Sequence, residues 1–202
     1  MTLRAIVLAA GESRRMGQPK AGLLVTAGGP TFAASAVSTL RACGLGDVVI
    51  VAGAHPDAVR QAVAGAAGVQ VIEHPGWAAG QLSSLLAGLA AVNAPDVEGL
   101  IVTLVDCPLV RPATVARLID VWRGSRPPIV RPAIGDRHGH PVIFDRAVFD
   151  DLRTAPLEIG AKAVISRWRD QLANVPVDDP GVLADIDTPA DYDALMRGRA
   201  RR

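Results

Sequence analysis

Near its N-terminus the chain reads Ala5-Ile6-Val7-Leu8-Ala9-Ala10-Gly11-Glu12-Ser13-Arg14-Arg15-Met16-Gly17-Gln18-Pro19-Lys20. A short apolar run comes first, and a loop that contains glycines follows it. An apolar strand that leads into such a loop can bring backbone N–H groups against a phosphate. The loop holds Arg14, Arg15 and Lys20 against one acid, Glu12, so it is locally cationic. Because arginine and lysine both bind phosphate oxygens, the stretch suits a nucleoside triphosphate.

The spacing of the glycines excludes two better-known phosphate-binding loops. A Walker loop requires G-x-x-x-x-G-K, whereas five residues separate Gly11 from Gly17 and Lys20 comes later. A dinucleotide fingerprint requires G-x-G-x-x-G directly after the strand, and that pattern is absent. The alternative is a surface loop with glycines for turning and arginines for solubility. The position, charge and length of the loop together favour phosphate binding.

The length allows one domain with a substantial core, or at most two small ones, and we expect a single domain over residues 1–202. Half of the 202 residues are apolar and only 3% are aromatic, so the core must consist mainly of Ala, Val, Leu and Ile. That usage is typical of a parallel sheet covered by helices on both faces. The net charge of +1 argues against a general binder of nucleic acid or membranes. The two cysteines lack metal-ligand spacing and no long apolar stretch occurs, so we expect a cytoplasmic enzyme with reduced thiols.

Strand-like and helix-like segments alternate in the first half of the chain. We expect strands over residues 4–9, 47–52, 69–73 and 99–105, and helices near residues 31–43, 57–66 and 81–93. This order predicts an α/β fold with a doubly wound, mostly parallel, Rossmann-like sheet. Ligands bind such sheets beyond the carboxyl ends of the strands. The loop over residues 10–20 and the segment Asp106-Cys107-Pro108 both fall on that edge.

The pattern changes after residue 124. A strand-like run from Pro127 to Arg131 precedes a turn at Gly135-Asp136 and a second run over residues 141–144. We expect the second run to return antiparallel as a small lid strand over the site, within an acceptor-binding lid at about 125–160. Residues 159–170 read as a helix. A capping box over residues 188–191 then opens the last helix.

One aspartate, Asp106, is a candidate for holding a metal ion by its position, and two others near the C-terminus are not explained by capping. Asp106 ends the buried-strand pattern of residues 100–105 at the ligand-binding edge, although aspartate there is also common as a turn or cap residue. Asp185 and Asp187 precede Thr188-Pro189, and capping of the last helix explains Thr188 but neither aspartate. Mg²⁺ prefers oxygen ligands and keeps several waters, so one or two carboxylates suffice.

Four motifs, in order along the chain, resemble the signature of the molybdenum-cofactor nucleotidylyltransferases, with a MobA/MocA-like NTP transferase domain. They are L-A-A-G-x-S-x-R-M-G-x-x-K from Leu8 to Lys20, the segment from Pro75 to Leu85, Asp106-Cys107-Pro108, and Asp185-Ile186-Asp187-Thr188-Pro189. Ala9-Ala10-Gly11 is similar to the cytidylyl branch, since guanylyl enzymes more often read Ala-Gly-Gly. Gly139-His140-Pro141 is similar to a motif of the same branch. The chain departs from the family pattern at His74, where the family has Asn, and at Cys107, where the cytidylyl branch often has Gln.

The resemblance also implies roles for individual residues. Those implied to bind the nucleotide are Leu8, Ala9, Ala10, Gly11, Lys20, Gly80 and Ser84. Arg15 and Lys20 would stabilise the triphosphate and the leaving pyrophosphate, with Asp106 as the third catalytic residue. Asp106 and Asp187 would hold Mg²⁺, with Asp185 as the alternative to Asp187. His140 would contact the phosphate acceptor, and its alternative role is to complete a turn.

The function implied is transfer of CMP from CTP to the phosphate of molybdopterin, with release of pyrophosphate. The partners implied are CTP, or GTP in a guanylyl enzyme, a molybdopterin-type acceptor, and a molybdoenzyme or its maturation chaperone as recipient. The alternative is a guanylyltransferase or a sugar-phosphate nucleotidylyltransferase of the same fold. A non-enzymatic module that binds the cofactor is a third alternative, and Lys20, Asp106 and Asp187 speak against it because a carrier needs no metal carboxylates.

Overall fold

The computed structural model describes residues 2–199, and the strands in that range form one sheet of eight. The strands are β1 (Thr2–Ala9), β2 (Val48–Ala52), β3 (Val69–Glu73), β4 (Val97–Leu104), β5 (Ile129–Ile134), β6 (Arg137–His138), β7 (Val142–Asp145) and β8 (Ala173–Pro176). The helices are α1 (Phe32–Arg41), α2 (Pro56–Ala62), α3 (Gln81–Val92), α4 (Pro112–Ser125), α5 (Phe149–Thr154), α6 (Ala161–Arg167) and α7 (Pro189–Arg199). Within residues 2–199, no helix is both long and apolar enough to cross a membrane.

The first four strands form the parallel part of the sheet. Their order is β3-β2-β1-β4, and each neighbouring pair runs parallel, as predicted. The chain therefore winds outward from β1 in one direction to β2 and β3, and then returns to place β4 on the other side of β1. The crevice at the carboxyl ends of β1 and β4 is thus the topological switch point, where doubly wound sheets bind their ligands.

The second half of the sheet corrects one prediction. Strand β7 is antiparallel, as expected, but it is not a lid over the site. It pairs with β4 from Gly99↔Asp145 to Val102↔Val142 and lies inside the sheet, between β4 and β5. The physical reason is that all four residues of β7 are buried, so the strand needs cover on both of its faces. Strand β8, which we did not predict, runs parallel to β5.

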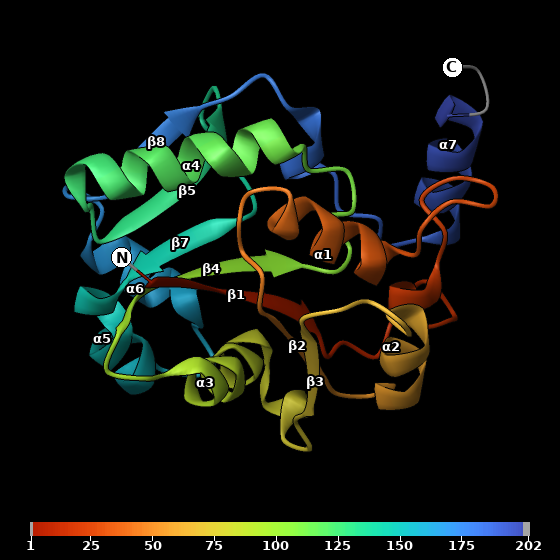
Figure 1. Cartoon of the computed structure of the whole chain (residues 1–202), viewed down its shortest axis with the longest axis horizontal. Coiled ribbons are helices and arrows are strands. Elements are labelled where there is room, and N and C mark those ends of the chain that lie inside the picture. The colour runs from red at the N-terminus through yellow and green to blue at the C-terminus, as the bar shows by residue number, and fades with distance from the viewer. Residues whose placement is uncertain (1, 200–202) are drawn as a thin grey trace.

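Helices cover both faces of the sheet (Figure 1). Successive side chains of a strand point to opposite faces. In β1, Ala5 and Val7 pack in a cluster with residues of α1, α2 and α4, whereas Ile6 and Leu8 pack in a second cluster with residues of α3, α5 and α6. Figure 1 shows α1 and α4 above the sheet and α3 and α5 below it. This packing fixes β1 and β4, and with them the edge at which both strands end.

The capping box at the start of α7 is confirmed. The Thr188 backbone N–H and hydroxyl both donate to Asp191 Oδ2, each at 2.8 Å, and the Asp191 backbone N–H donates to Thr188 Oγ1 at 3.2 Å. The Asp187 backbone N–H also donates to Asp191 Oδ2, at 3.2 Å. The cap therefore fixes the backbone of the segment that carries Asp185 and Asp187.

Thr188→Ala is expected to lower the free energy of unfolding by about 1 kcal/mol, because it removes the side chain that satisfies the first turn of α7. Urea unfolding followed by circular dichroism measures the change. Thr188→Ser keeps the hydroxyl and should stay close to the wild type. Equal losses in the two variants would contradict a capping role for the hydroxyl.

Candidate functional site

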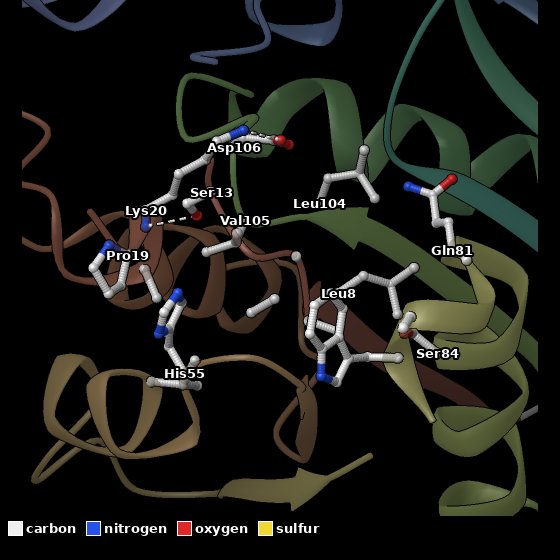
Figure 2. Close-up of a pocket in the computed structure, with 18 residues that line it drawn as sticks. Leu8, Ser13, Pro19, Lys20, His55, Gln81, Ser84, Leu104, Val105 and Asp106 are labelled. Carbon is white, nitrogen blue, oxygen red and sulfur yellow. Dashed lines mark hydrogen bonds and ion pairs between the residues drawn. The ribbon is translucent and has the colours of Figure 1, made fainter. Parts of the chain in front are cut away.

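A pocket of about 370 Å³ lies at the switch point (Figure 2). Its walls come from the end of β1, the loop over residues 10–20, the start of α3 and the end of β4. Seven lining residues are those that the resemblance implied for nucleotide binding: Leu8, Ala9, Ala10, Gly11, Lys20, Gly80 and Ser84. Figure 2 shows Ser13, Lys20 and Asp106 on one side of the pocket and Gln81 and Ser84 on the other. The structure therefore brings together segments that are far apart in the sequence.

The loop over residues 10–20 is held in a defined shape. Ser13 and Gly17 both have a positive φ, and the Ser13 carbonyl accepts hydrogen bonds from the N–H groups of Met16 and Gly17. The Lys20 N–H donates to Ser13 Oγ at 3.3 Å. These bonds turn the chain back on itself, so Lys20 returns to the carboxyl end of β4.

Lys20 lies between two of the predicted metal ligands. Its Nζ donates to Asp106 Oδ2 at 2.9 Å and also forms a hydrogen-bonded ion pair with Asp187 Oδ1. The second oxygen of Asp187 pairs with the Arg15 guanidinium at 2.7 Å. The Lys20 side chain is only 12% exposed, whereas that of Arg15 is 70% exposed. Arg15 therefore lies at the rim of the site, and Lys20 is a part-buried cation between the two carboxylates.

The ionisation of this cluster follows from its contacts. Burial by itself lowers the pKa of Lys20, but its hydrogen bonds to Asp187 and Asp106 outweigh burial and raise that pKa above 10.5. The hydrogen bond from Lys20 is the main cause that lowers the pKa of Asp187 below its usual 3.8, and Arg15 adds to it. Lys20 and Asp187 are therefore both charged at pH 7.

This pair predicts a pH dependence of stability. Because the folded pKa of Asp187 lies below 3.8, its carboxylate stabilises the folded chain above about pH 4, and this contribution is lost as the pH falls through the folded pKa. Asp187→Asn should therefore be less stable than the wild type at pH 6, and the difference should shrink below pH 4. Urea unfolding across this range measures it. A difference that does not vary with pH would argue against a charged Asp187.

The segment that carries the later aspartates is tied to the end of β4. The Ile186 backbone N–H donates to the Asp106 carbonyl at 2.9 Å, and Cys107 Sγ donates to Asp185 Oδ1 at 3.1 Å. Burial, followed by the charge of Asp106, raises the pKa of the Cys107 thiol, so it stays protonated. Asp185 thus faces Cys107, whereas Asp187 faces Lys20.

The donor set fits a hard divalent cation. Carboxylate oxygens of Asp106 and Asp187 already converge on one positive charge, the Lys20 ammonium. Oxygen ligands of this kind suit Mg²⁺ and Mn²⁺. Asp106, Cys107 and Asp185 also place one potential ligand atom each within 4.8 Å of one another. The protonated, buried thiol is a poor ligand for such a cation, so Asp106 with either Asp187 or Asp185 is the better-fitting pair.

The start of α3 forms the wall opposite Lys20. Gly80 has φ 106° and precedes the first turn of the helix, where no side chain caps the N–H groups. Free N–H groups at a helix N-terminus favour anions and polar ligand atoms. Ser84 is buried on the same helix and lines the pocket. His74, which stands where the family has Asn, makes a 3.1 Å hydrogen bond to Ser83 Oγ and is not part of the pocket lining.

A second pocket, of about 470 Å³, adjoins the first and shares Leu8, Gly80 and Gln81 with it. His140, predicted to contact the acceptor, lines this pocket. Its other walls come from β5, β7, the segment 157–160 and α6. Residues between 131 and 162 thus form much of the second pocket, and strand β7 among them is not a lid. That the region at about 125–160 binds the acceptor stays a prediction.

Sequence reasoning assigned no role to several residues that line the first pocket, among them His55, Trp77 and Gln81. His55 follows β2 at the carboxyl edge of the sheet, so the rule that pointed to Asp106 applies to it as well. The His55 ring contacts the Glu12 carbonyl at 3.1 Å. Trp77 lies close to Gly53: a Cβ at Gly53 would meet Trp77 Cβ at 2.6 Å and the ring atom Cγ at 2.7 Å.

Residues 5–175 match the family model of the MobA-like NTP transferase domain. The chain belongs to this family. The match confirms the family resemblance inferred from the motifs, and it ends before Asp185 and Asp187. The roles of individual residues remain predictions.

Relatives and solved structures agree with this assignment. Nicotine blue oxidoreductase from Paenarthrobacter nicotinovorans is 35% identical over 146 residues, which are 69% of each chain. The crystal structure of Rv0371c from Mycobacterium tuberculosis H37Rv matches with a TM-score of 0.79 and 33% identity, over 98% of this chain and all of that one. A structure of Rv0371c in complex with manganese matches at 30% identity and a TM-score of 0.74, over 98% of this chain and 99% of that one.

Proposed function

We propose that this MobA-like NTP transferase domain is a cytidylyltransferase that transfers CMP from CTP to the phosphate of molybdopterin and releases pyrophosphate. The observation that supports it best is the part-buried Lys20, which links Asp106 and Asp187 at one end of the first pocket. We assign the acceptor to the second pocket, which adjoins the first. We also propose that the protein works in the cytoplasm as a single domain.

The chain's own residues perform the transfer mainly by positioning and charge. A phosphate monoester is already a nucleophile at pH 7, so no general base is required. Backbone groups of the loop after β1 and of the start of α3 orient the nucleotide, with its triphosphate toward Lys20. Lys20 and Arg15 then neutralise charge on the leaving pyrophosphate.

Asp106 and Asp187 would hold Mg²⁺, with Asp185 as the alternative second ligand. When bound, Mg²⁺ neutralises phosphate charge and orients the reacting groups. Three contacts of the described residues support this assignment: the two carboxylates share one cation, their segments are joined through the Ile186–Asp106 hydrogen bond, and the capping box fixes the backbone beside Asp187.

The first test is pyrophosphate release from CTP, GTP, ATP and UTP in the presence of Mg²⁺ and molybdopterin. We expect release with CTP alone, at a rate that depends on the acceptor. Release with GTP alone would move the protein to the guanylyl branch. Pyrophosphate release only when a sugar phosphate replaces molybdopterin would favour the sugar-phosphate alternative. No pyrophosphate release from any nucleotide with active molybdopterin would favour the carrier module.

A second candidate rests on the 35% identical relative that is named an oxidoreductase. If this chain shares that activity, it should reduce nicotine blue in the presence of an added electron donor. Two results together would favour reduction over nucleotidyl transfer. The blue colour would disappear only when both the electron donor and the protein are present, and no pyrophosphate would be released in the first assay.

A further inference from the structure

The segment that leads from β8 to α7 is fastened to several distant parts of the molecule (Figure 1). We call this segment, residues 177–187, the strap, and both of the later aspartates lie near its end. At its start, the Val177 backbone N–H donates to the Ala133 carbonyl of β5 at 3.0 Å. Near its end, the Ile186 backbone N–H donates to the Asp106 carbonyl. The strap therefore runs from the second half of the sheet to the switch point.

Asp179 anchors the strap to the start of α4 through a buried carboxylate, since this residue is only 2% exposed. Its Oδ2 accepts hydrogen bonds from the Arg111 backbone N–H at 2.9 Å and from Thr114 Oγ1 at 2.7 Å. Its Oδ1 accepts from the Gly181 backbone N–H at 3.1 Å and lies 3.7 Å from Arg111 Nε. A buried carboxylate is costly unless such partners compensate it, so both oxygens hold the strap in this one position.

Two glycines allow the strap to lie directly against backbone on either side. A Cβ at Gly181 would collide with the Leu109 carbonyl, in the loop that follows β4. A Cβ at Gly139, in the turn before β7, would collide with the Val182 carbonyl of the strap. The same Val182 carbonyl accepts a hydrogen bond from the His140 backbone N–H at 3.1 Å. Neither glycine has room for a methyl group, so the strap packs directly between these two loops.

The position of the strap decides where the later carboxylates lie. Asp187 forms its ion pair with Lys20, and Asp185 accepts from the Cys107 thiol. Asp106, in contrast, directly follows β4 and is held by the sheet. A metal site requires its ligands within about 0.5 Å of the productive geometry. The sheet provides this precision for Asp106, and the fastened strap provides it for the other two.

We propose that Asp179 is a positioning residue of the proposed active site, whose buried carboxylate holds the strap so that Asp185 and Asp187 lie beside Asp106. The inference rests on the proposed function in that these aspartates hold the metal ion. Asp179 is not part of the described lining of either pocket, so it acts through the backbone of the strap. Loss of the anchor should weaken metal binding, because it frees the strap while Asp106 stays in place.

The test measures metal binding, so it does not depend on turnover. The probe is Mn²⁺, titrated into the whole chain without nucleotide and followed by electron paramagnetic resonance. Asp179→Ala should weaken Mn²⁺ binding about tenfold, as is typical when a group that orients metal ligands is lost. Asp179→Asn keeps one oxygen to accept hydrogen bonds, so its Mn²⁺ affinity should fall between those of Asp179→Ala and the wild type.

The matched control is Asp178→Ala, which removes the same charge from the adjacent, exposed position. The Asp178 carbonyl, which accepts from the Arg111 guanidinium, is kept in this variant. It should bind Mn²⁺ as the wild type does. Equal Mn²⁺ affinities of Asp179→Ala and Asp178→Ala would overturn the proposal, and so would a wild-type chain that binds no Mn²⁺.

A second variant tests the proposal even if Asp179→Ala does not fold. Gly181→Ala keeps every hydrogen-bonding group of the anchor and adds a methyl group that must displace the strap from the loop after β4. It should weaken Mn²⁺ binding at least about threefold. Gly198→Ala is its control and should change nothing, because a Cβ at Gly198 meets no atom within 4 Å.

Urea unfolding of the same variants separates positioning from a purely structural role. A purely structural role predicts lower urea midpoints for Asp179→Ala and Gly181→Ala together with wild-type Mn²⁺ affinity in the folded protein. That combination would contradict the proposal. Weaker Mn²⁺ binding by folded variants, measured well below their urea midpoints, would support it.

Failure of this proposal and failure of the proposed function have different signatures. Pyrophosphate release from CTP by the wild type, combined with unchanged Mn²⁺ affinity in Asp179→Ala, would reject the positioning role and keep the transferase. Weaker Mn²⁺ binding in both Asp179→Ala and Gly181→Ala would support the positioning role, even if the wild type released no pyrophosphate from any of the four nucleotides.

Discussion

Asp106→Ala is expected to reduce metal-dependent pyrophosphate release by about 10³-fold, because it removes the carboxylate that ends β4 at the switch point. Asp106 accepts a hydrogen bond from Lys20 and lines the nucleotide pocket, so the substitution also leaves Lys20 with Asp187 alone. The rate should not recover at higher CTP concentration, since the lost interaction concerns the metal and the transition state. Initial rates at saturating CTP, measured against Mg²⁺ concentration, check this.

The matched control is Asp96→Ala, which removes an exposed aspartate just before the other end of β4. It should retain wild-type rates. Asp106 is partly exposed, so Asp106→Ala should unfold near the urea midpoint of the wild type. A folded Asp106→Ala variant with full activity would remove Asp106 from the proposed mechanism.

Lys20→Ala is expected to lower kcat/KM for CTP by about 10² to 10³-fold, because the part-buried ammonium that neutralises the triphosphate is lost. Arg14→Ala provides the matched control. Arg14 is a cation of the same loop, but it is highly exposed and pairs with Glu12 rather than with the aspartates. It should change kcat/KM by less than about threefold, in line with the small energies of surface ion pairs.

Lys20→Ala should also bind metal ions more tightly than the wild type in the absence of nucleotide. In the wild type the Lys20 ammonium pairs with carboxylate oxygens of both Asp106 and Asp187, so a divalent cation competes with it for those atoms. Titration of Mn²⁺ by electron paramagnetic resonance measures this affinity without turnover. Weaker Mn²⁺ binding in Lys20→Ala would show that the two carboxylates do not form the metal site.

The sequence predicted the parallel half of the fold well. The expected strands and helices before residue 105 agree with the structure to within a few residues, because each is marked by local apolar patterns and by turns. The rule that ligands bind at the carboxyl edge then placed the loop after β1 and Asp106 together. That rule uses only the order of strands, so it requires no knowledge of side-chain contacts.

The second half of the sheet and the grouping of the site residues depend on contacts between distant parts of the chain. Lys20 and Asp187 are 167 residues apart, and only the family resemblance suggested that they share a site. The position of β7 could not be inferred either, since an apolar run of four residues fits a sheet interior as well as a covering strand. Strand β8 pairs with β5 through residues about 43 positions apart, and its own short sequence gives little periodic signal.

Strand β7 joins the two halves of the sheet through only four paired positions along β4. The residues proposed to bind the nucleotide precede this junction, and the later aspartates follow β8, so the intervening stretch can change without altering either set. We therefore expect that exchange of residues 129–176 as a unit changes the acceptor that a family member uses. The nucleotide that it uses stays the same. A chimaera of this chain that takes residues 129–176 from a relative should keep this chain's preference among nucleoside triphosphates. Its preference among acceptors should become that of the relative.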